Sequence, residues 1–419
     1  MQFRYLGYAL KLAFTRHDDQ EEGDISHFQA LMTALAATIG IGSIAGVATA
    51  VVGGGFGAIF WMWVIALIGM ATKFSEAVLA IKFRIKDRLG QICGGPMHYI
   101  DRGLKWKWLA VVFALFGILS SFAGGNMTQA HSIADAFFHL TGISPVWTGA
   151  ILALITGFVL IGGIVGISRF CAILVPAMAA MYILGGLLIL VIHYDRLLPS
   201  LDSIFRSALF PRAAIGGVGG AGIIAALQFG VARGISSNEA GLGSGPIAAA
   251  AAKTDVPGRQ AMISMTTVFL STIVVCTITA LVISVTGVLG SKDGAGNVLN
   301  GAPLVMAAFR STIPYGQHVV AIGLMLFGYS TIVGWSYYGE KCLEYLLGER
   351  SIYPFRFFFT LLVFLGSLLS IDIVWPLVDI MNGLMALPNL IALLFLSTVA
   401  VRESRQFFQL VAKEKSMSA

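Results

Sequence analysis

Residues 35–64 read LAATIGIGSIAGVATAVVGGGFGAIFWMWV, an apolar run that seven glycines interrupt. Glycine costs about 1 kcal/mol of helix propensity relative to alanine, and backbone that leaves helical geometry at membrane depth survives where it lines a cavity or is buried in protein. Residues 230–252, GVARGISSNEAGLGSGPIAAAAA, have the same character. Two hydrophobic segments interrupted by glycine, at corresponding places in two halves of a chain, indicate the binding site of a secondary transporter.

The composition predicts a polytopic membrane protein. Of 419 residues, 57% are hydrophobic and 11% are charged, whereas a soluble domain is about 25% charged. A span needs about 20 predominantly apolar residues. Ten such segments are expected at residues 28–52, 57–82, 108–137, 147–166, 171–193, 215–251, 260–286, 315–346, 355–371 and 373–401.

The distribution of positive charge predicts the orientation. If the chain starts inside, the cytoplasmic segments hold 20 of the 27 Lys and Arg residues and the outer segments hold five. Cytoplasmic loops are rich in Lys and Arg, so we expect both termini in the cytoplasm and the protein in the plasma (inner) membrane. The net charge of +6 therefore needs no nucleic-acid partner. The four cysteines imply no disulfide framework.

This topology divides the chain into two units of five spans. An odd number of spans in each unit makes the second unit lie inverted relative to the first. The outer connection is expected to contain a short interfacial helix, and the polar tail is expected to fray. The predicted parts are a cytoplasmic N-terminal segment (1–27), a first unit (28–193), an extracellular connection (194–214), a second unit (215–401) and a cytoplasmic tail (402–419).

Charged residues inside the predicted spans are candidates for function. Lys73 and Glu76 lie three residues apart on one helical face, either as an internally satisfied ion pair or in a gating or proton-relay role. Arg233 and Glu239 bracket the polar run ISSN, and we expect them to pair, for function or to fix the unwound backbone. A charge at membrane depth costs about 2.5–3.5 kcal/mol on insertion scales.

Polar residues without charge add further candidates. Asn126 and Gln129 in the third span either bond neighbouring helices or face the transport pathway. Ser330 and Thr331 form an adjacent hydroxyl pair in the eighth span, and such a pair facing a broken helix supplies the oxygen ligands that a hard monovalent cation takes. The sequence contains no H-E-x-x-H, P-loop or paired-cysteine motif, so an enzyme is not expected.

Several runs carry a family resemblance over nearly the whole chain. FQALMTALAATIG (28–40), GMATKFSEAVLAIKFR (69–84), SNEAGLGS (237–244) and FGYSTIVGWSYYGEKCLEYL (327–346) resemble the alanine or glycine:cation symporter family. The resemblance implies an all-α, LeuT-type fold of ten transmembrane helices in a five-plus-five inverted repeat, with the first helix of each repeat discontinuous. It also implies symport of a small neutral amino acid coupled to sodium, with the proton as the alternative coupling ion.

The same resemblance implies a set of site residues. The amides freed at the first break would receive the substrate carboxylate at the positive end of a half-helix. The residues implied for the substrate are Gly40, Ile41, Gly42, Ser43, Phe122, Asn126, Gln129, Ser236, Asn238 and Trp335. Those implied for sodium are Ala36, Ile39, Ser330 and Thr331, with Ser43 and Ser271 forming a weakened second sodium site.

Departures from the family pattern leave an alternative open. Family members resemble G-T-G-N where this chain has Gly40-Ile41-Gly42-Ser43, show phenylalanine at Ser236, and show aspartate at Ser271. They usually carry one more hydrophobic helix before the first broken span, so we expect either a truncated start or a divergent paralogue. The alternative function is a transport-dead membrane protein that binds an amino acid and signals.

Overall fold

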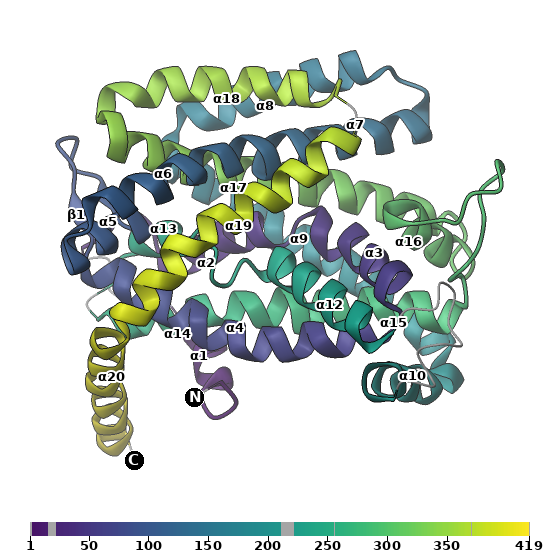
Figure 1. The fold of residues 1–419 in the computed structure, drawn as a ribbon, viewed down its shortest axis with the longest axis horizontal. Coiled ribbons are helices and arrows are strands. Elements are labelled where there is room, and N and C mark those ends of the chain that lie inside the picture. The colour runs from purple at the N-terminus through teal and green to yellow at the C-terminus, as the bar shows by residue number, and fades with distance from the viewer. Residues whose placement is uncertain (1, 16–21, 211–221, 255, 370, 419) are drawn as a thin grey trace.

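In the computed structural model the chain is almost entirely helical, and its long helices run side by side between two ends of the molecule (Figure 1). The structure describes residues 2–15, 22–210, 222–254, 256–369 and 371–418. In chain order the elements are α1 (Leu6–Phe14), α2 (His27–Thr38), η1 (Ile41–Ser43), α3 (Ala45–Gly54), α4 (Gly57–Lys82), β1 (Ile85–Lys86), β2 (Ile92–Cys93), α5 (Pro96–Tyr99), η2 (Ile100–Leu104), α6 (Lys107–Phe122), η3 (Ala123–Met127), α7 (Thr128–Thr141), α8 (Pro145–Ile161), α9 (Gly163–Ile192), η4 (Tyr194–Arg196), α10 (Leu197–Leu209), α12 (Ile223–Asn238), α13 (Gly245–Ala250), α14 (Pro257–Val268), η5 (Phe269–Cys276), α15 (Thr277–Thr286), α16 (Gly301–Arg310), α17 (Gly316–Leu347), η6 (Glu349–Ser351), α18 (Ile352–Gly366), α19 (Ile371–Phe395) and α20 (Ser397–Ser418).

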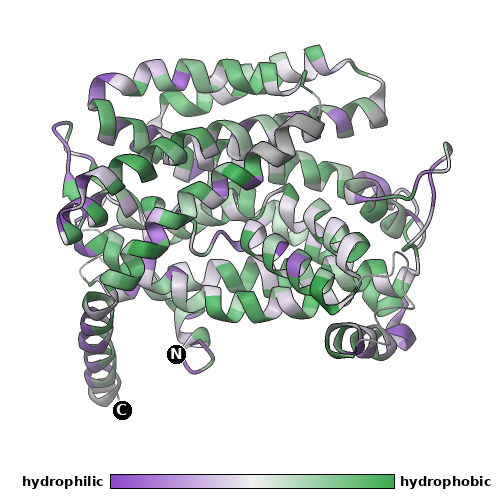
Figure 2. Ribbon diagram, in the orientation of Figure 1, coloured by the Kyte–Doolittle hydropathy of each residue, from purple (hydrophilic) through white to green (hydrophobic). Residues whose placement is uncertain are grey.

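The two ends of the molecule differ in what they carry. The antiparallel β1–β2 hairpin and α5 lie at one end, here called the hairpin end, and α10 and α16 lie at the other, here called the α10 end (Figure 1). Hydrophobic residues extend along the long helices, while hydrophilic ones gather in the hairpin, in α20 and in the loops of the α10 end (Figure 2). Large apolar side chains are exposed on the outward faces of α8, α9 and α18. Continuous apolar surface of this kind marks a face that contacts lipid or a partner.

Six helical stretches of the described residues are long and apolar enough to cross a membrane. The remaining predicted spans are interrupted at a break or form shorter helices such as α8 and α18. The predicted start of the sixth span at Ile215 lies outside the described residues. A multi-span helical membrane protein is therefore confirmed.

The first predicted span is discontinuous, as expected. A capping box begins α2, because the Ser26 hydroxyl accepts from the Gln29 N–H at 3.2 Å and the Gln29 side chain accepts from the Ser26 N–H at 3.0 Å. The helix ends before Gly40, η1 makes one tight turn, and α3 continues the span. Gly55, at φ 67°, then turns the chain into α4.

The tail is helical, so the expectation that it frays is wrong. One face of α20 is apolar, with Phe407 and Val411 buried one turn apart. Ion pairs hold its flanks, with 3.0 Å between Lys82 Nζ and Glu403 Oε1 and 2.9 Å between Arg259 and a carboxylate oxygen of α20. An amphipathic face that packs against the body stabilises a helix whose overall composition is polar.

Candidate substrate and ion site

The second break lies opposite the first. Helix α12 ends at Asn238, and Glu239 adopts a left-handed conformation with φ 56°. Gly241 (φ 89°) and Gly243 (φ 82°) continue the non-helical path until α13 begins at Gly245. Left-handed geometry is easy for glycine and uncommon for other residues, so the glycines allow the break and Glu239 is held in it by its surroundings.

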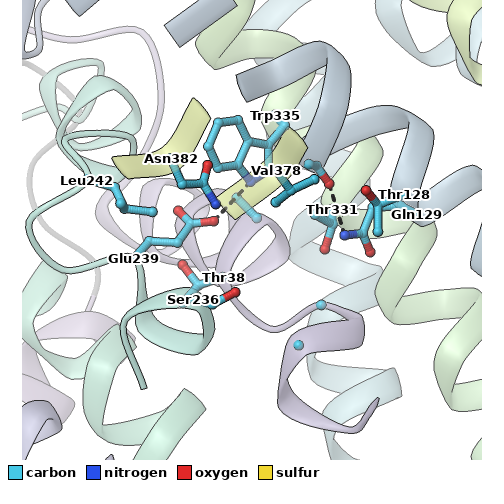
Figure 3. A pocket seen from close by; sticks show the side chains of 14 residues that line it. Thr38, Thr128, Gln129, Ser236, Glu239, Leu242, Thr331, Trp335, Val378 and Asn382 are labelled. Carbon is cyan, nitrogen blue, oxygen red and sulfur yellow. Dashed lines mark hydrogen bonds between the residues drawn. The ribbon is translucent and has the colours of Figure 1, made fainter. Parts of the chain in front are cut away.

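A small cavity lies between the two breaks, α17, η3, α7 and α19 (Figure 3). Its volume is about 50 Å³, on a measure that assigns about 10–15 Å³ to one water. Roughly four waters on this measure correspond to a ligand with few heavy atoms. The lining residues are Ala37, Thr38, Gly40, Gly42, Gly124, Thr128, Gln129, Ser236, Glu239, Leu242, Thr331, Trp335, Val378 and Asn382.

The first break offers free backbone donors to this cavity. The amide N–H groups of Gly40, Ile41 and Gly42 have no acceptor among the residues that the structure describes. The next two amides bond back to Gly40 and Ile41 in tight turns. Free amides at the start of a helix carry partial positive charge and bind anions such as carboxylates. The arrangement can therefore hold a carboxylate.

Oxygen atoms gather on the other side of the first break. Ser330 Oγ and Thr331 Oγ1 lie 3.2 and 3.1 Å from the Ala36 carbonyl oxygen, and both lie 2.9 Å from the Phe327 carbonyl oxygen. Each hydroxyl has one proton to donate, so two protons serve four close oxygen contacts. The surplus of lone pairs at Ala36 suits a small cation. Ile39, which the resemblance also implies as a sodium ligand, is the C-cap residue of α2, and its N–H donates to the Leu35 carbonyl.

The backbone at Gly40 is close to this oxygen cluster. A side chain there would place its Cβ 2.6 Å from Thr331 Oγ1, closer than such atoms approach in proteins. Thr331 also lines the cavity. The candidate cation ligands and the free amides are thus adjacent.

The two serines expected to form a second sodium site, Ser43 and Ser271, bond to different partners. Ser43 Oγ lies 3.3 Å from Ser237 Oγ, and the Ser43 carbonyl accepts from Thr279 Oγ1 at 3.1 Å. Ser271 Oγ instead donates back to the Val268 carbonyl at 3.4 Å. Within the described residues no hydrogen bond joins Ser43 to Ser271.

A wide helical turn positions Gln129. The chain forms a π-helical turn at η3, a feature that often marks functional sites, and Gly125 lets it approach α17, since a Cβ there would lie 2.3 Å from Trp335 Cβ. Gln129 Nε2 donates to the Gly124 carbonyl at 3.0 Å. Gln129 lines the cavity, and its Oε1 atom is buried and has no hydrogen-bond partner among the described residues.

The expected pair of Arg233 and Glu239 is not formed. Glu239 accepts from Trp335 Nε1 at 2.9 Å and from Ser244 Oγ at 2.6 Å, and Arg233 lies 3.5 Å from Asp379. The left-handed conformation of Glu239 turns its side chain into the cavity, while Arg233 lies two turns back along α12. The pair was expected to bracket the unwound backbone, but the helix ends at Asn238 and the backbone at Glu239 directs its carboxylate to other donors.

Lys73 and Glu76 also bond to the second break more closely than to each other. Lys73 Nζ donates to the carbonyls of Asn238 and Glu239 at 3.4 and 3.2 Å. Glu76 Oε1 accepts from the Gly241 N–H at 3.0 Å and from Asn389 Nδ2 at 2.6 Å. Both side chains are buried. Their positions attach α4 to the unwound segment.

The structure brings only part of the expected substrate set to the cavity. Gly40, Gly42, Gln129, Ser236 and Trp335 line it. The others have different surroundings: Phe122 stacks on Phe355, Asn126 donates to the Phe359 carbonyl, Asn238 accepts from the Ala240 N–H, and Ile41 lines a separate cavity toward the α10 end.

Sequence reasoning missed other lining residues, among them Thr38, Thr128, Leu242, Val378 and Asn382. A polar side chain within an apolar span was a usable signal for Asn382. Nothing in the pattern marks Leu242 or Val378.

A cluster at the hairpin end resembles a metal site in composition only. Ligand atoms of Asp87, Cys93 and Glu344 lie within 4.8 Å of one another. Lys341 Nζ lies 2.7 Å from Glu344 Oε2 and 3.3 Å from Cys93 Sγ, where it supplies the positive charge. Burial raises the pKa of the Cys93 thiol, which disfavours the thiolate that metals bind.

Comparisons with known proteins agree with this geometry. The family model described as the sodium:alanine symporter family matches residues 1–419. The chain is 53% identical to the sodium/alanine symporter AgcS of Methanococcus maripaludis over 419 residues, covering 99% of this chain and 91% of that protein. It is 46% identical to an uncharacterized transporter of Haemophilus influenzae, covering 98% and 89%.

Among solved structures, the crystal structure of MhsT in complex with L-phenylalanine is similar, with a TM-score of 0.64 at 17% identity, covering 92% of this chain and 93% of that one. This likeness establishes the fold, and the matched family establishes the class of protein as transporter rather than enzyme. The chain belongs to the sodium:alanine symporter family.

Proposed function

We propose that this protein couples sodium entry to the uptake of a small neutral amino acid of the alanine or glycine class, by alternating access. One observation carries the proposal: free amides for a carboxylate and an oxygen cluster for a cation adjoin at the first break, beside a small cavity of about 50 Å³. A small zwitterion and a monovalent cation are ligands of matching size and charge.

The fine architecture belongs to the same proposal. The ten spans form two inverted units, 28–193 and 215–401, joined by the outer connection 194–214. Both termini, 1–27 and 402–419, lie in the cytoplasm, and the protein resides in the plasma (inner) membrane. The positive charges of the loops and the breaks in α2–α3 and α12–α13 support this assignment.

The test is uptake of labelled alanine into proteoliposomes with and without an inward sodium gradient. Accumulation above equilibrium that depends on sodium is expected. Glycine and alanine should compete for uptake, and an imposed proton gradient without sodium should not drive it.

The same measurement distinguishes a sodium-coupled symporter from the alternative, a transport-dead amino-acid sensor. The departures at Ser43 and Ser271 favour that alternative, because they remove ligands from the second cation position. Alanine binding without sodium-driven accumulation would select the sensor.

A further inference from the structure

Glu239 is an acid placed where the proposed substrate would carry its positive charge. It is one of the three non-glycine residues with positive φ among the described residues, along with Lys105 and Tyr315. Strained backbone of this kind costs about 1–3 kcal/mol and clusters at functional sites. This backbone conformation turns the Glu239 carboxylate toward the same space as the Trp335 ring and the Asn382 amide (Figure 3).

The hydrogen bonds of Glu239 leave acceptor capacity unused. Its donors are two neutral groups, Trp335 Nε1 and Ser244 Oγ, whereas an ionised carboxylate can accept about four hydrogen bonds. The side chain is 4% exposed, so bulk water does not fill the remaining positions. A donor from inside the cavity is the available partner.

The charges around Glu239 do not balance when every group is ionised. Among the described residues, Lys73 is the cation of this cluster, and its two carboxylates are Glu76 and Glu239. The other titratable groups that face it from the packed elements are Tyr338 of α17 and, beyond Glu76, Tyr99 of α5, while Arg233 and Asp379 pair with each other. The cluster therefore carries one uncompensated negative charge at membrane depth, which is costly.

The geometry indicates which of the two carboxylates carries the uncompensated negative charge. Glu76 is fully buried, lies one turn from Lys73 on α4, and accepts from Asn389 and from the Gly241 N–H. It does not line the cavity, and Glu239 does. Lys73 faces both carboxylates and forms an ion pair with neither among the described residues, so Glu239 is the carboxylate that a cation in the cavity can reach.

We propose that Glu239 is a cation-exchange position: its carboxylate binds the ammonium group of the amino acid, and in the empty protein a proton takes that place. The inference rests on the proposed function and names its amine subsite. The balance is complete in both states. In the empty state Glu239 is neutral, and the charges of Lys73 and Glu76 cancel. On binding, the Glu239 proton passes to solvent as the ammonium arrives, and the net charge of the cluster stays at zero.

The first test compares binding of alanine and of lactate, which replaces the ammonium by a hydroxyl, by competition against labelled alanine or by calorimetry. Wild-type protein should prefer alanine strongly. In Glu239→Gln, which keeps the length and the acceptor for Trp335, alanine should bind at least tenfold more weakly while lactate is unchanged. The control Glu349→Gln removes a carboxylate of η6 that belongs neither to this cluster nor to the cavity lining, and it should keep the wild-type preference.

The second test needs no variant. Alanine added to wild-type protein in weakly buffered sodium solution near pH 7 should release about one proton for each alanine bound. No release, or an unchanged alanine-to-lactate ratio in folded Glu239→Gln, would overturn the assignment. Wild-type protein that fails to bind alanine at all would refute the proposed function itself, whereas alanine binding with no proton release refutes only the role of Glu239.

Discussion

Replacing Ser330 and Thr331 by alanine should shift the sodium response to much higher sodium concentrations. The two hydroxyls and the Ala36 carbonyl form the oxygen cluster at the first break, with separations of 3.2 and 3.1 Å. A hydrogen-bonding contact to a charged partner contributes about 1.5 kcal/mol or more, so losing two costs about 3 kcal/mol. Since about 1.4 kcal/mol is a factor of ten, the sodium concentration for half-maximal uptake should rise roughly 100-fold.

The assay is initial alanine uptake into proteoliposomes over a range of external sodium. Because Ser43 bonds to Ser237 and Ser271 bonds to its own helix, we expect a single sodium position and a wild-type curve with a Hill coefficient near one. Ser336→Ala is the matched control, since this buried serine of α17 donates to the Val333 carbonyl at 2.6 Å and should leave the curve unchanged. A steeply sigmoidal wild-type curve, or a half-maximal sodium concentration that the double substitution leaves unchanged, would refute the reasoning.

Three further predictions concern single positions. Gly40→Ala should reduce uptake at least tenfold, because its Cβ would lie 2.6 Å from Thr331 Oγ1; uptake kinetics with a thermal-stability control check this, and normal uptake by the folded variant would contradict it. Ser236→Phe should exclude amino acids larger than glycine by filling the cavity that Ser236 lines, and an unchanged ranking of competitors would show that the residue does not face the substrate. Burial lowers the pKa of His98 from 6.5 to about 4. Between pH 6.5 and pH 4 the unfolded chain therefore binds more protons than the folded protein. The free energy of unfolding should fall by about 3 kcal/mol as the pH drops from 6.5 to 4. Thermal unfolding of the wild type and of His98→Gln in detergent measures this loss, and equal pH dependence of the two would count against it.

The sequence was a good guide to the path of the backbone. The glycines at 40, 42, 241 and 243 predicted both breaks, because glycine adopts the non-helical backbone conformations of an unwound segment more easily than other residues. The span 57–82 has the bounds of α4. These features depend on local composition, which a sequence displays directly.

Partners in space were harder to predict. Arg233 and Glu239 were expected to pair because they bracket the unwound segment, but the left-handed turn at Glu239 separates them. Phe122 was assigned to the cavity wall, yet the π-helical turn that follows it redirects the chain, and the ring stacks on Phe355. Val378 could not be found, since an apolar side chain in an apolar span gives no signal until the helices pack.

The position of the oxygen cluster gives a physical reason for coupling. Ala36 supplies its carbonyl to the cluster, and four residues later Gly40 begins the free amides that would hold the carboxylate. A cation bound by Ala36, Ser330 and Thr331 would fix the backbone of the break against α17, and so order those amides before the amino acid arrives. The substrate would then avoid part of the entropy of ordering, which is about 1–2 kcal/mol for each residue fixed. Because coupling between two binding sites is reciprocal, the amino acid must increase sodium affinity by the same factor. Two ratios of dissociation constants should therefore be equal. One is the ratio for sodium measured without and with saturating alanine, and the other is the ratio for alanine measured without and with saturating sodium.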